Sequence, residues 1–240
     1  MGSMTKKEAR ENKLMDTLSE CHRMSISEVT ELLHISEASA RRLFTKMQSE
    51  GKLLRVHGGV QITHELRNDY SFIHSINTQN PAKKKIGEKA AQKVQSSEQI
   101  FLDAGTTVLK MADALVNRLA SSEISNLTII TNSLCLPTSL ANYCDVILIG
   151  GTIRPQRRDV CGALARQILL KYSFKRVFFG ADAVSENGEI MTTDPETAEI
   201  NALFINRSQK AYLLADTEKF NKTSPITFAN THNITAVISS

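Results

Sequence analysis

The chain has 240 residues, of which 41% are hydrophobic and 22% charged, and its formal net charge is +4. This composition is ordinary for a soluble globular protein with a sizeable core, so a mainly disordered chain is not expected. The mild basic excess permits a polyanionic partner without requiring one. The four cysteines form no CxxC pair, and no apolar run approaches the roughly 20 residues that span a bilayer. We therefore expect a cytoplasmic protein with reduced thiols and without a metal, a cofactor or a membrane partner.

Three helices are predicted in the first fifty residues, after a polar start, MGSMTKK, that we interpret as added sequence before a native Met4. The first helix runs from about Lys6 to Cys21, and the second follows the capping run Ser25–Ser27. The third opens at Ser36 and has apolar residues at positions i, i+3, i+4 and i+7 between Ala40 and Met47.

A short β-hairpin is predicted directly after the third helix. Gly51 ends that helix, and apolar strand residues within 52–61 surround the turn Gly58-Gly59. Three small helices followed by such a hairpin indicate a winged helix-turn-helix domain, which we assign to residues 4–60.

Polar and basic side chains are expected on the outer face of the third helix and on the hairpin. Arginine can bond guanine edges or phosphates in a bidentate manner, which suits a recognition helix. The alternative is an ordinary helical hairpin with solvated charges. The first sixty residues hold ten Lys/Arg and eight Asp/Glu, a difference of only +2, so charge alone favours that alternative, whereas helix spacing and the Gly-Gly turn favour DNA binding. The candidate DNA-binding residues are Ser39, Arg41, Arg42, Thr45, Lys46, Arg55, His57, Gly58 and Gly59.

The rest of the chain is predicted to be a linker, residues 61–80, and an α/β domain, residues 81–240. A helix starts near the basic run Lys83–Lys85, which either is a solvated helix start or contacts DNA or a partner subunit. Strands alternating with helices then indicate a mainly parallel sheet covered by helices. The expected strands are 100–102, 127–130, 146–149, 176–179, 211–214 and 236–238, and the expected helices include 108–119, 162–170 and one that starts at Pro195 after a cap by Asp194.

Polar or glycine-rich loops follow five of the predicted strands. In open α/β sheets, ligands bind beyond the carboxyl ends of the strands. The loop from Asp103 to Thr107 is placed to hold a dianion at a helix N-terminus, and Arg154 adds a cation nearby. Each loop taken alone is also compatible with an ordinary turn. The other loops are 131–133, 150–151, 180–182 and 215–216.

Both parts of the chain resemble the DeoR family of bacterial regulators. The runs SEASARRLF, from Ser36, and EGKLLRVHGG, from Glu50, are similar to the family's recognition helix and wing, although Ser39-Ala40 and Leu43 replace the usual threonine-isoleucine and aspartate. FLDAGTT, ITNSL, LIGG, FGAD and LADTEKF are similar to its successive sensor motifs. The family usually ends its last strand with an aspartate and a short tail, so we expect a shortened edge at the C-terminus.

The resemblance implies a sensor domain related to ribose-5-phosphate isomerase and coenzyme A transferase folds, and a phosphorylated sugar as its effector. Glu199 is as well explained by a solvated or capping role as by a role in the site. By this resemblance, the effector site would be lined by Asp103, Gly105, Thr106, Thr107, Thr131, Asn132, Ser133, Gly151, Arg154, Asp182, Glu199 and Lys219.

The function implied is that of a transcriptional regulator, most often a repressor, which binds operator DNA as a homodimer or larger homo-oligomer. One alternative is a sugar-phosphate isomerase or hydrolase with an accessory DNA-binding module. Asp103, Asp182, Glu199 and Lys219 would then supply acid-base chemistry, although no nucleophile with a base and an orienting group is visible. A second alternative is a constitutive DNA-binding protein with a vestigial sensor.

Overall fold

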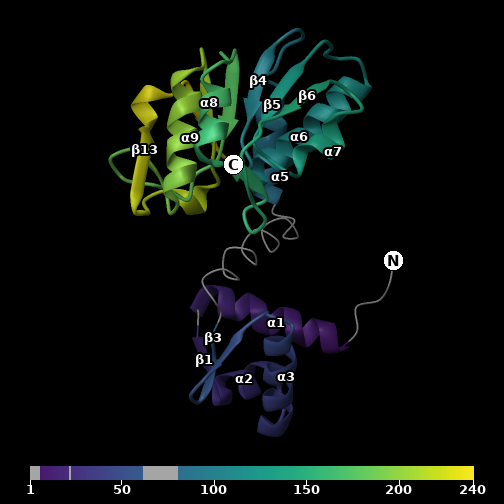
Figure 1. The fold of residues 1–240 in the computed structure, drawn as a ribbon, viewed down its shortest axis with the longest axis vertical. Coiled ribbons are helices and arrows are strands. Elements are labelled where there is room, and N and C mark those ends of the chain that lie inside the picture. The colour runs from purple at the N-terminus through teal and green to yellow at the C-terminus, as the bar shows by residue number, and fades with distance from the viewer. Residues whose placement is uncertain (1–5, 22, 62–80) are drawn as a thin grey trace. The chain divides into compact units, whose positions relative to one another are not determined.

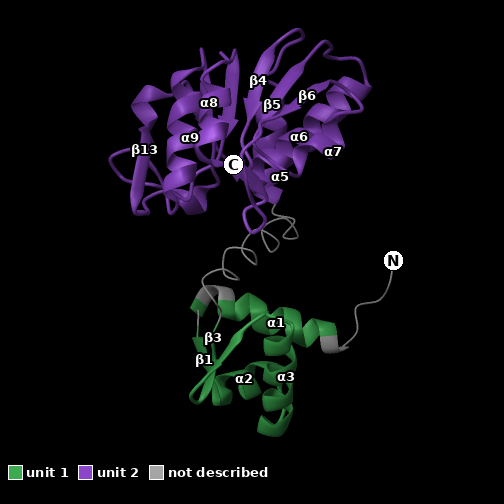
Figure 2. Ribbon diagram, viewed as in Figure 1, with its two compact units in different colours: residues 1–78 green, residues 79–240 purple. Residues whose placement is uncertain are grey.

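The computed structural model describes residues 6–21, 23–61 and 81–240. The chain forms two compact units, residues 1–78 and residues 79–240 (Figures 1 and 2). Most of the predicted linker, residues 62–80, lies outside the described residues. Gln61, where that linker was expected to begin, still belongs to a strand.

Unit 1 combines three helices with three short strands in its described part (Figure 1). Helix bounds follow from the caps. Ser25 and Glu28 form a reciprocal capping box at the start of the second helix, and Ser36 accepts a bond from the Ser39 amide at the start of the third. The elements are α1 (Lys6–Cys21), β1 (Arg23–Ser25), α2 (Ile26–Leu33), α3 (Glu37–Ser49), β2 (Leu54–Val56) and β3 (Gly59–Gln61).

The wing of unit 1 is a three-stranded sheet rather than the predicted two-stranded hairpin. Strand β1 pairs with β3, which pairs with β2, so β3 is central. Gly58 adopts φ +77°, and a Cβ on Gly59 would lie 2.1 Å from the carbonyl oxygen of Met24 in β1. The Gly-Gly pair is therefore required once for a left-handed turn and once for a close approach of two strands.

Unit 2 is a three-layer α/β structure. Its six-stranded sheet has the order β14-β12-β9-β4-β5-β6, and all its pairs are parallel, which confirms the predicted fold class. The principal elements are α5 (Pro81–Ala91), β4 (Gln99–Leu102), α6 (Thr106–Ala120), β5 (Thr128–Thr131), α7 (Leu136–Leu140), β6 (Asp145–Leu148), α8 (Gly162–Leu169), β9 (Arg176–Phe179), α9 (Pro195–Asn206), β12 (Ala211–Leu214) and β14 (Ala236–Ile238).

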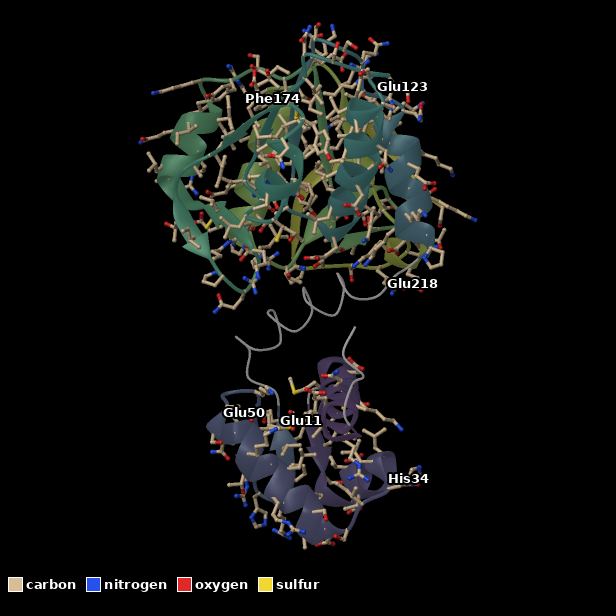
Figure 3. The ribbon with its side chains drawn as sticks, turned by 90° about the vertical axis from the view of Figure 1, so that its right-hand side faces the viewer. Glu11, His34, Glu50, Glu123, Phe174 and Glu218 are labelled. Carbon is tan, nitrogen blue, oxygen red and sulfur yellow. The ribbon has the colours of Figure 1, made fainter. Side chains whose placement is uncertain are left out.

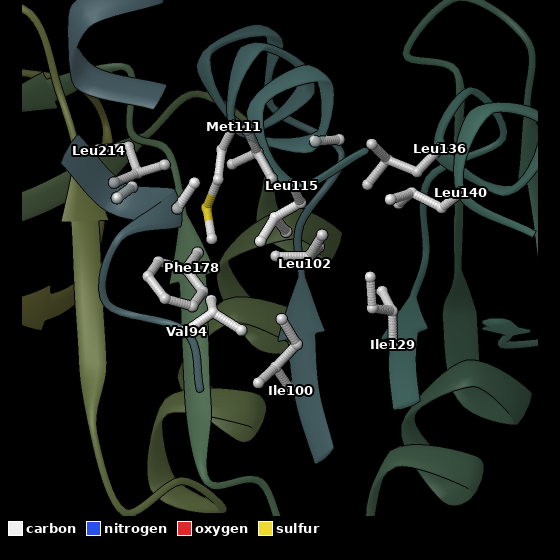
Figure 4. Close-up of a cluster of buried hydrophobic side chains, with 14 of the residues drawn as sticks. Val94, Ile100, Leu102, Met111, Leu115, Ile129, Leu136, Leu140, Phe178 and Leu214 are labelled. Atoms are coloured by element: carbon white, nitrogen blue, oxygen red, sulfur yellow. The ribbon is translucent and has the colours of Figure 1, made fainter. Parts of the chain in front are cut away.

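Helices cover both faces of this sheet. Side chains that alternate along each strand enter two different cores: Leu102 and Phe178 pack under α5, α6 and α7, whereas Phe101 and Phe179 pack under α8 and α9. Figure 4 shows the first core, with strand residues facing the helices. Burial on both faces explains why these strands are continuous apolar runs.

Several short elements were not predicted. They lie outside the parallel sheet, and antiparallel pairing rather than a local run of apolar residues defines their strands. The hairpin β7 (Thr152–Arg154) and β8 (Asp159–Cys161) lies beside the main sheet, and a second, antiparallel sheet contains β10 (Ala183–Val184), β11 (Glu189–Thr192) and β13 (Ile226–Asn230). The 3₁₀ turns η1 (Thr217–Lys219) and η2 (Thr231–Asn233) complete the described elements.

Helices α5 and α6 approach each other closely at one glycine. An added Cβ on Gly87 would lie 2.6 Å from the backbone carbon of Lys110 and 2.6 Å from the backbone nitrogen of Met111. Both atoms belong to the α6 backbone, so a side chain at this position has no flexible neighbour to displace. The first helix of unit 2 is thus held against the helix that follows β4.

We predict that Gly87→Ala lowers the free energy of unfolding of unit 2 by about 1–3 kcal/mol, because the methyl group overpacks the contact with α6. Urea unfolding measures the change. Lys84→Ala, an exposed change in the same helix, serves as the control and should stay within about 0.5 kcal/mol. An unconstrained helical glycine would behave in the opposite way and gain about 0.5–1 kcal/mol on replacement by alanine.

Candidate DNA-binding surface and effector site

The exposed side of α3 presents two arginines. Arg41 and Arg42 are both exposed, while Ala40, Phe44 and Met47 are buried on the opposite side of the helix. Arg41 makes a 3.5 Å surface ion pair with Glu37, which is worth less than about 1 kcal/mol and is readily exchanged for another partner. The face of α3 that periodicity predicts for DNA binding therefore has both arginine side chains exposed.

Lys46 lies in a different environment from the two arginines. Its ammonium group contacts Glu11 of α1 and lies 3.3 Å from Glu50, and Lys52 joins the same two carboxylates. Figure 3 shows Glu11 and Glu50 close together in unit 1. Burial would raise the pKa of Glu11, but the bonds from the two lysines outweigh it and hold that pKa below its ordinary value. This network fastens α1 to α3.

The wing is attached to the helices by hydrogen bonds. The Ile26 amide, at the start of α2, donates to the Gly58 carbonyl at 2.9 Å. Arg55 of β2 donates to the hydroxyl group of Thr45 on α3 at 3.1 Å, and Thr45 in turn donates to the Arg41 carbonyl at 3.0 Å. Thr45 thus links Arg55 of the wing to Arg41 of α3, and His57 of the wing is exposed.

In unit 2, the parallel strands bring the predicted loops to one edge of the sheet. β4 lies between β5 and β9, and β5 and β9 lead the chain away in opposite directions. Ligands bind at such a switch point. Figure 3 shows Glu218, which follows β12, at the opposite end of unit 2 from Phe174, which precedes β9. The loops after β4, β5, β6, β9 and β12 share the Glu218 end.

Asp103 occupies the switch point. It is 7% exposed, and burial raises the pKa of its carboxyl group to about 6, although bonds from the amides of Ala104 and Gly180 act in the opposite direction. The Gly180 amide, after β9, lies 3.4 Å from the Asp103 carboxylate. A buried carboxylate with a raised pKa is a candidate functional group.

The N-terminus of α6 opens beside Asp103. Gly105 caps the helix without a side-chain bond, and a Cβ added to it would lie 3.6 Å from the Asp103 carboxylate and 3.7 Å from the Gly180 nitrogen. Thr106 and Thr107 form the first turn, and Thr107 is buried. The free amides at the start of a 15-residue helix favour an anion.

The loop after β5 contains one structural residue and one unsatisfied residue. The Thr131 hydroxyl donates to the Leu102 carbonyl at 2.6 Å and accepts from the Ser133 amide at 3.0 Å, so it fastens β5 to β4. Asn132 is only 3% exposed, yet its Oδ1 has no hydrogen-bond partner among the described residues. A buried acceptor without a donor is costly unless a ligand or water supplies one.

Acidic groups also follow β9 and β12. Asp182 accepts bonds from the Thr192 hydroxyl and from the amide and hydroxyl of Thr193, at 2.8–3.0 Å. Asp216 is buried, and its Oδ1 lacks a partner in the described part of the chain. Lys219 ends the turn η1 and bonds the Asp216 carbonyl through its backbone amide at 3.1 Å. Asp216 was not included in the predicted set of effector-site residues.

Arg154 is held by carboxylates. It makes two bonds to Asp159, at 2.8 and 2.6 Å, one to Asp194 at 2.5 Å, and one to the Thr197 hydroxyl at 3.0 Å. Burial opposes the charge on Arg154, but the two carboxylates outweigh it and keep its pKa above the ordinary value. A Cβ on Gly151 would lie 2.4 Å from the Cys161 carbonyl, so Gly151 permits the β7–β8 hairpin to close.

Glu199 lies on the exposed side of α9. Its side chain is 58% exposed and pairs with Arg166 of α8 at 2.6 Å. The structure therefore joins it to a neighbouring helix, whereas Asp103, Gly105 and Gly180 converge at the switch point. In the described residues, no helix is long and apolar enough to cross a membrane, and no group of three or more His, Cys, Asp or Glu side chains is arranged to hold a metal ion.

Residues 78–240 match the family described as the DeoR C terminal sensor domain, and residues 10–65 match the DeoR-like helix-turn-helix domain. The chain belongs to the DeoR family. Its members are transcriptional regulators, so this DeoR protein is a DNA-binding regulator and not an enzyme.

Two relatives match this chain almost from end to end. It is 27% identical to the uncharacterized HTH-type transcriptional regulator FruR of Bacillus subtilis, over 95% of this chain and 89% of that protein. It is 29% identical to the lactose phosphotransferase system repressor of Streptococcus mutans, over 97% and 92%. Ribose 5-phosphate isomerase from Plasmodium falciparum is similar in structure, with a TM-score of 0.43 and 17% identity over 57% of this chain, which spans 52% of that enzyme.

We predict that Asp103→Asn stabilises unit 2 at high pH. The folded pKa of Asp103 is raised from 3.8 to about 6, so ionisation opposes folding. The free-energy cost of ionising Asp103 in the folded protein is absent below about pH 3.8, grows as the pH rises, and reaches about 3 kcal/mol above pH 6. The asparagine variant should therefore exceed the wild type by up to about 3 kcal/mol at pH 8 and by roughly half of that at pH 5.

Urea unfolding at the two pH values measures this difference. Asp182→Ala is the control, because it removes the carboxylate oxygen that accepts bonds from the Thr192 hydroxyl and from the Thr193 amide and hydroxyl. It should lower the free energy of unfolding. An Asp103→Asn variant that is less stable than the wild type at pH 8 would contradict the cost assigned to this buried charge.

Proposed function

We propose that this member of the DeoR family is a cytoplasmic transcriptional repressor whose affinity for operator DNA is controlled by a phosphorylated sugar. Residues 4–60 read the operator, and residues 81–240 bind the effector. The protein acts as a homodimer or larger homo-oligomer, because helix-turn-helix proteins commonly read two half-sites related by symmetry. The repressor role is supported by the similarity to the lactose phosphotransferase system repressor of Streptococcus mutans.

The DNA-binding part of the proposal rests on α3 and the wing. Arg41 and Arg42 carry the exposed charge on α3, and Arg55 brings the wing against the same helix through Thr45. Arginine reads guanine through two bonds, while wing residues such as His57 suit backbone contacts that set the register. In this proposal Lys46 acts mainly by holding α3 to α1.

The effector part rests on a single arrangement, the buried carboxylate of Asp103 beside the open N-terminus of α6. The helix end favours a phosphate, whereas a carboxylate favours the hydroxyl groups of a sugar. Asn132 and Asp216 add buried acceptors that have no partner in the described residues, which a polyhydroxylated ligand would satisfy. We assign supporting roles around the ligand to Thr131, Ser133, Gly151, Arg154, Asp182 and Lys219, and leave out Glu199, which pairs with Arg166 on the exposed side of α9.

Control of DNA binding follows from a difference in affinity. An effector shifts the protein between DNA-competent and incompetent arrangements only as far as it binds one of them better. Moving such an equilibrium from 1:99 to 99:1 requires a preference of about 10⁴-fold. Reciprocity then requires operator DNA to change effector affinity by the same factor as the effector changes DNA affinity.

We expect effector affinity to differ between the free protein and its operator complex. A panel of pentose and hexose phosphates is first screened by thermal shift, and any ligand found is titrated by calorimetry with and without operator duplex. The ratio of the two dissociation constants should equal the effector-induced change in operator affinity. Equal affinities would show a constitutive DNA-binding protein whose ligand site exerts no control.

Arg42→Ala should weaken operator binding by about 1–3 kcal/mol and relax specificity at one base pair if Arg42 contacts a base. A uniform loss across sequences, with a shallower salt dependence, is expected if it contacts a phosphate. Fluorescence anisotropy at several salt concentrations distinguishes these results. Arg10→Ala, on α1, removes the same charge from unit 1, and an equal loss in both variants would contradict a specific role for α3.

A further inference from the structure

The turn of the β7–β8 hairpin is fixed over the loop that follows β5. The Leu134 amide donates to the Arg158 carbonyl at 2.9 Å, and the Val160 amide donates to the Asn132 carbonyl at 2.9 Å. An isolated bridge also pairs Ser133 with Asp159. Because β5 and β4 are neighbours, this places the turn, residues 155–158, beside the loop that begins at Asp103.

The base of the same hairpin is fastened by Arg154. Its four side-chain bonds join the hairpin strand β8, through Asp159, to the start of α9, through Asp194 and Thr197. An anion could recruit this guanidinium only by displacing carboxylates that already neutralise it. Arg154 is thus suited to positioning the hairpin rather than to gripping a free phosphate.

The turn itself carries two further arginines, Arg157 and Arg158, which act in different directions. The positive charge of Arg157 reaches Asp103 and lowers its pKa, against the larger effect of burial. The charge of Arg158 instead reaches the thiol of Cys135, at the start of α7. Arg157 is half-buried and Arg158 is exposed, and within the described ranges no hydrogen bond or ion pair holds either guanidinium group, so the two differ in burial and in which group their charge faces.

We propose that Arg157 is the cation that binds the anionic group of the effector. The inference deepens the function proposed above and rests on it. A half-buried arginine that lacks a carboxylate partner, beside a helix N-terminus, keeps its planar donors for a phosphate.

The position of Asp103 then sets the orientation of the ligand. A dianion placed against that carboxylate would be repelled, whereas hydroxyl donors would be attracted. The ligand class is therefore a compound with a phosphate monoester at the Arg157 end and hydroxyl groups at the Asp103 end. A sugar without its phosphate would contact Asp103 through its hydroxyl groups but would leave Arg157 without an anion.

The test compares Arg157→Ala with its neighbour Arg158→Ala, which removes the same charge from the same turn. Thermal unfolding of the full-length protein is followed with inorganic phosphate, with ribose 5-phosphate and with ribose, each against chloride at equal ionic strength. Phosphate and the sugar phosphate should stabilise the wild type and Arg158→Ala. Arg157→Ala should bind them about 10- to 100-fold more weakly, which is the range of a lost charged hydrogen bond. Arg157→Lys, which keeps the charge and loses the planar fork, should lie between them.

Each result decides the proposal. Equal losses in the two alanine variants would indicate a general effect of charge and would overturn it. So would undiminished binding by Arg157→Ala, although the function proposed above would then still stand. No stabilisation of the wild type by inorganic phosphate or ribose 5-phosphate would overturn the anion site. If the wider panel of sugar phosphates also failed, the proposed function would fail separately.

Discussion

Parallel pairing of the strands is the constraint on which unit 2 depends. Because β14, β12, β9, β4, β5 and β6 all run in one direction, their carboxyl ends meet at one edge. The chain leaves β4 toward β5 and β6 on one side and returns through β9 and β12 on the other. Loops separated by more than a hundred residues, such as those after β4 and β12, therefore share that edge. None of their side chains needs to be close in sequence for a common site to form.

The edge at the carboxyl ends of the strands contains buried polar groups that reduce the stability of the fold. Two thick apolar cores support it, one on each face of the sheet (Figure 4 shows the first), and they tolerate a buried carboxylate and two acceptors without partners. At the opposite edge, Glu98 is neutralised by an ion pair with Arg176. The carboxylate of Glu98 thus has a cationic partner, whereas Asp103 has no ion pair among the described residues. Carboxyl groups with a raised pKa cluster at functional sites.

Local patterns were sufficient to predict the regular elements. Periodicity and caps located α1 and the starts of α3 and α9, and apolar runs bounded β9, β12 and β14 as observed. Strand β1 was missed because its three residues have no pattern of their own and depend on pairing with β3. The pairing of Arg154 with Asp194 joins residues forty positions apart. Lys46 was predicted on the outer face of α3, but its ammonium group contacts Glu11, which depends on how α1 packs against α3. Such tertiary contacts leave no signature in a local window.

The wing of unit 1 has a consequence for how this protein meets a duplex. Its turn is bonded to the start of α2, its central strand is paired on both sides, and Arg55 already touches α3. Reader and wing are consequently preorganised, and little conformational entropy remains to be lost on association. A rigid protein surface leaves the adjustment of shape to the nucleic acid. Groove width and the ease of bending then contribute to the choice of sequence, even at base pairs that no side chain reaches.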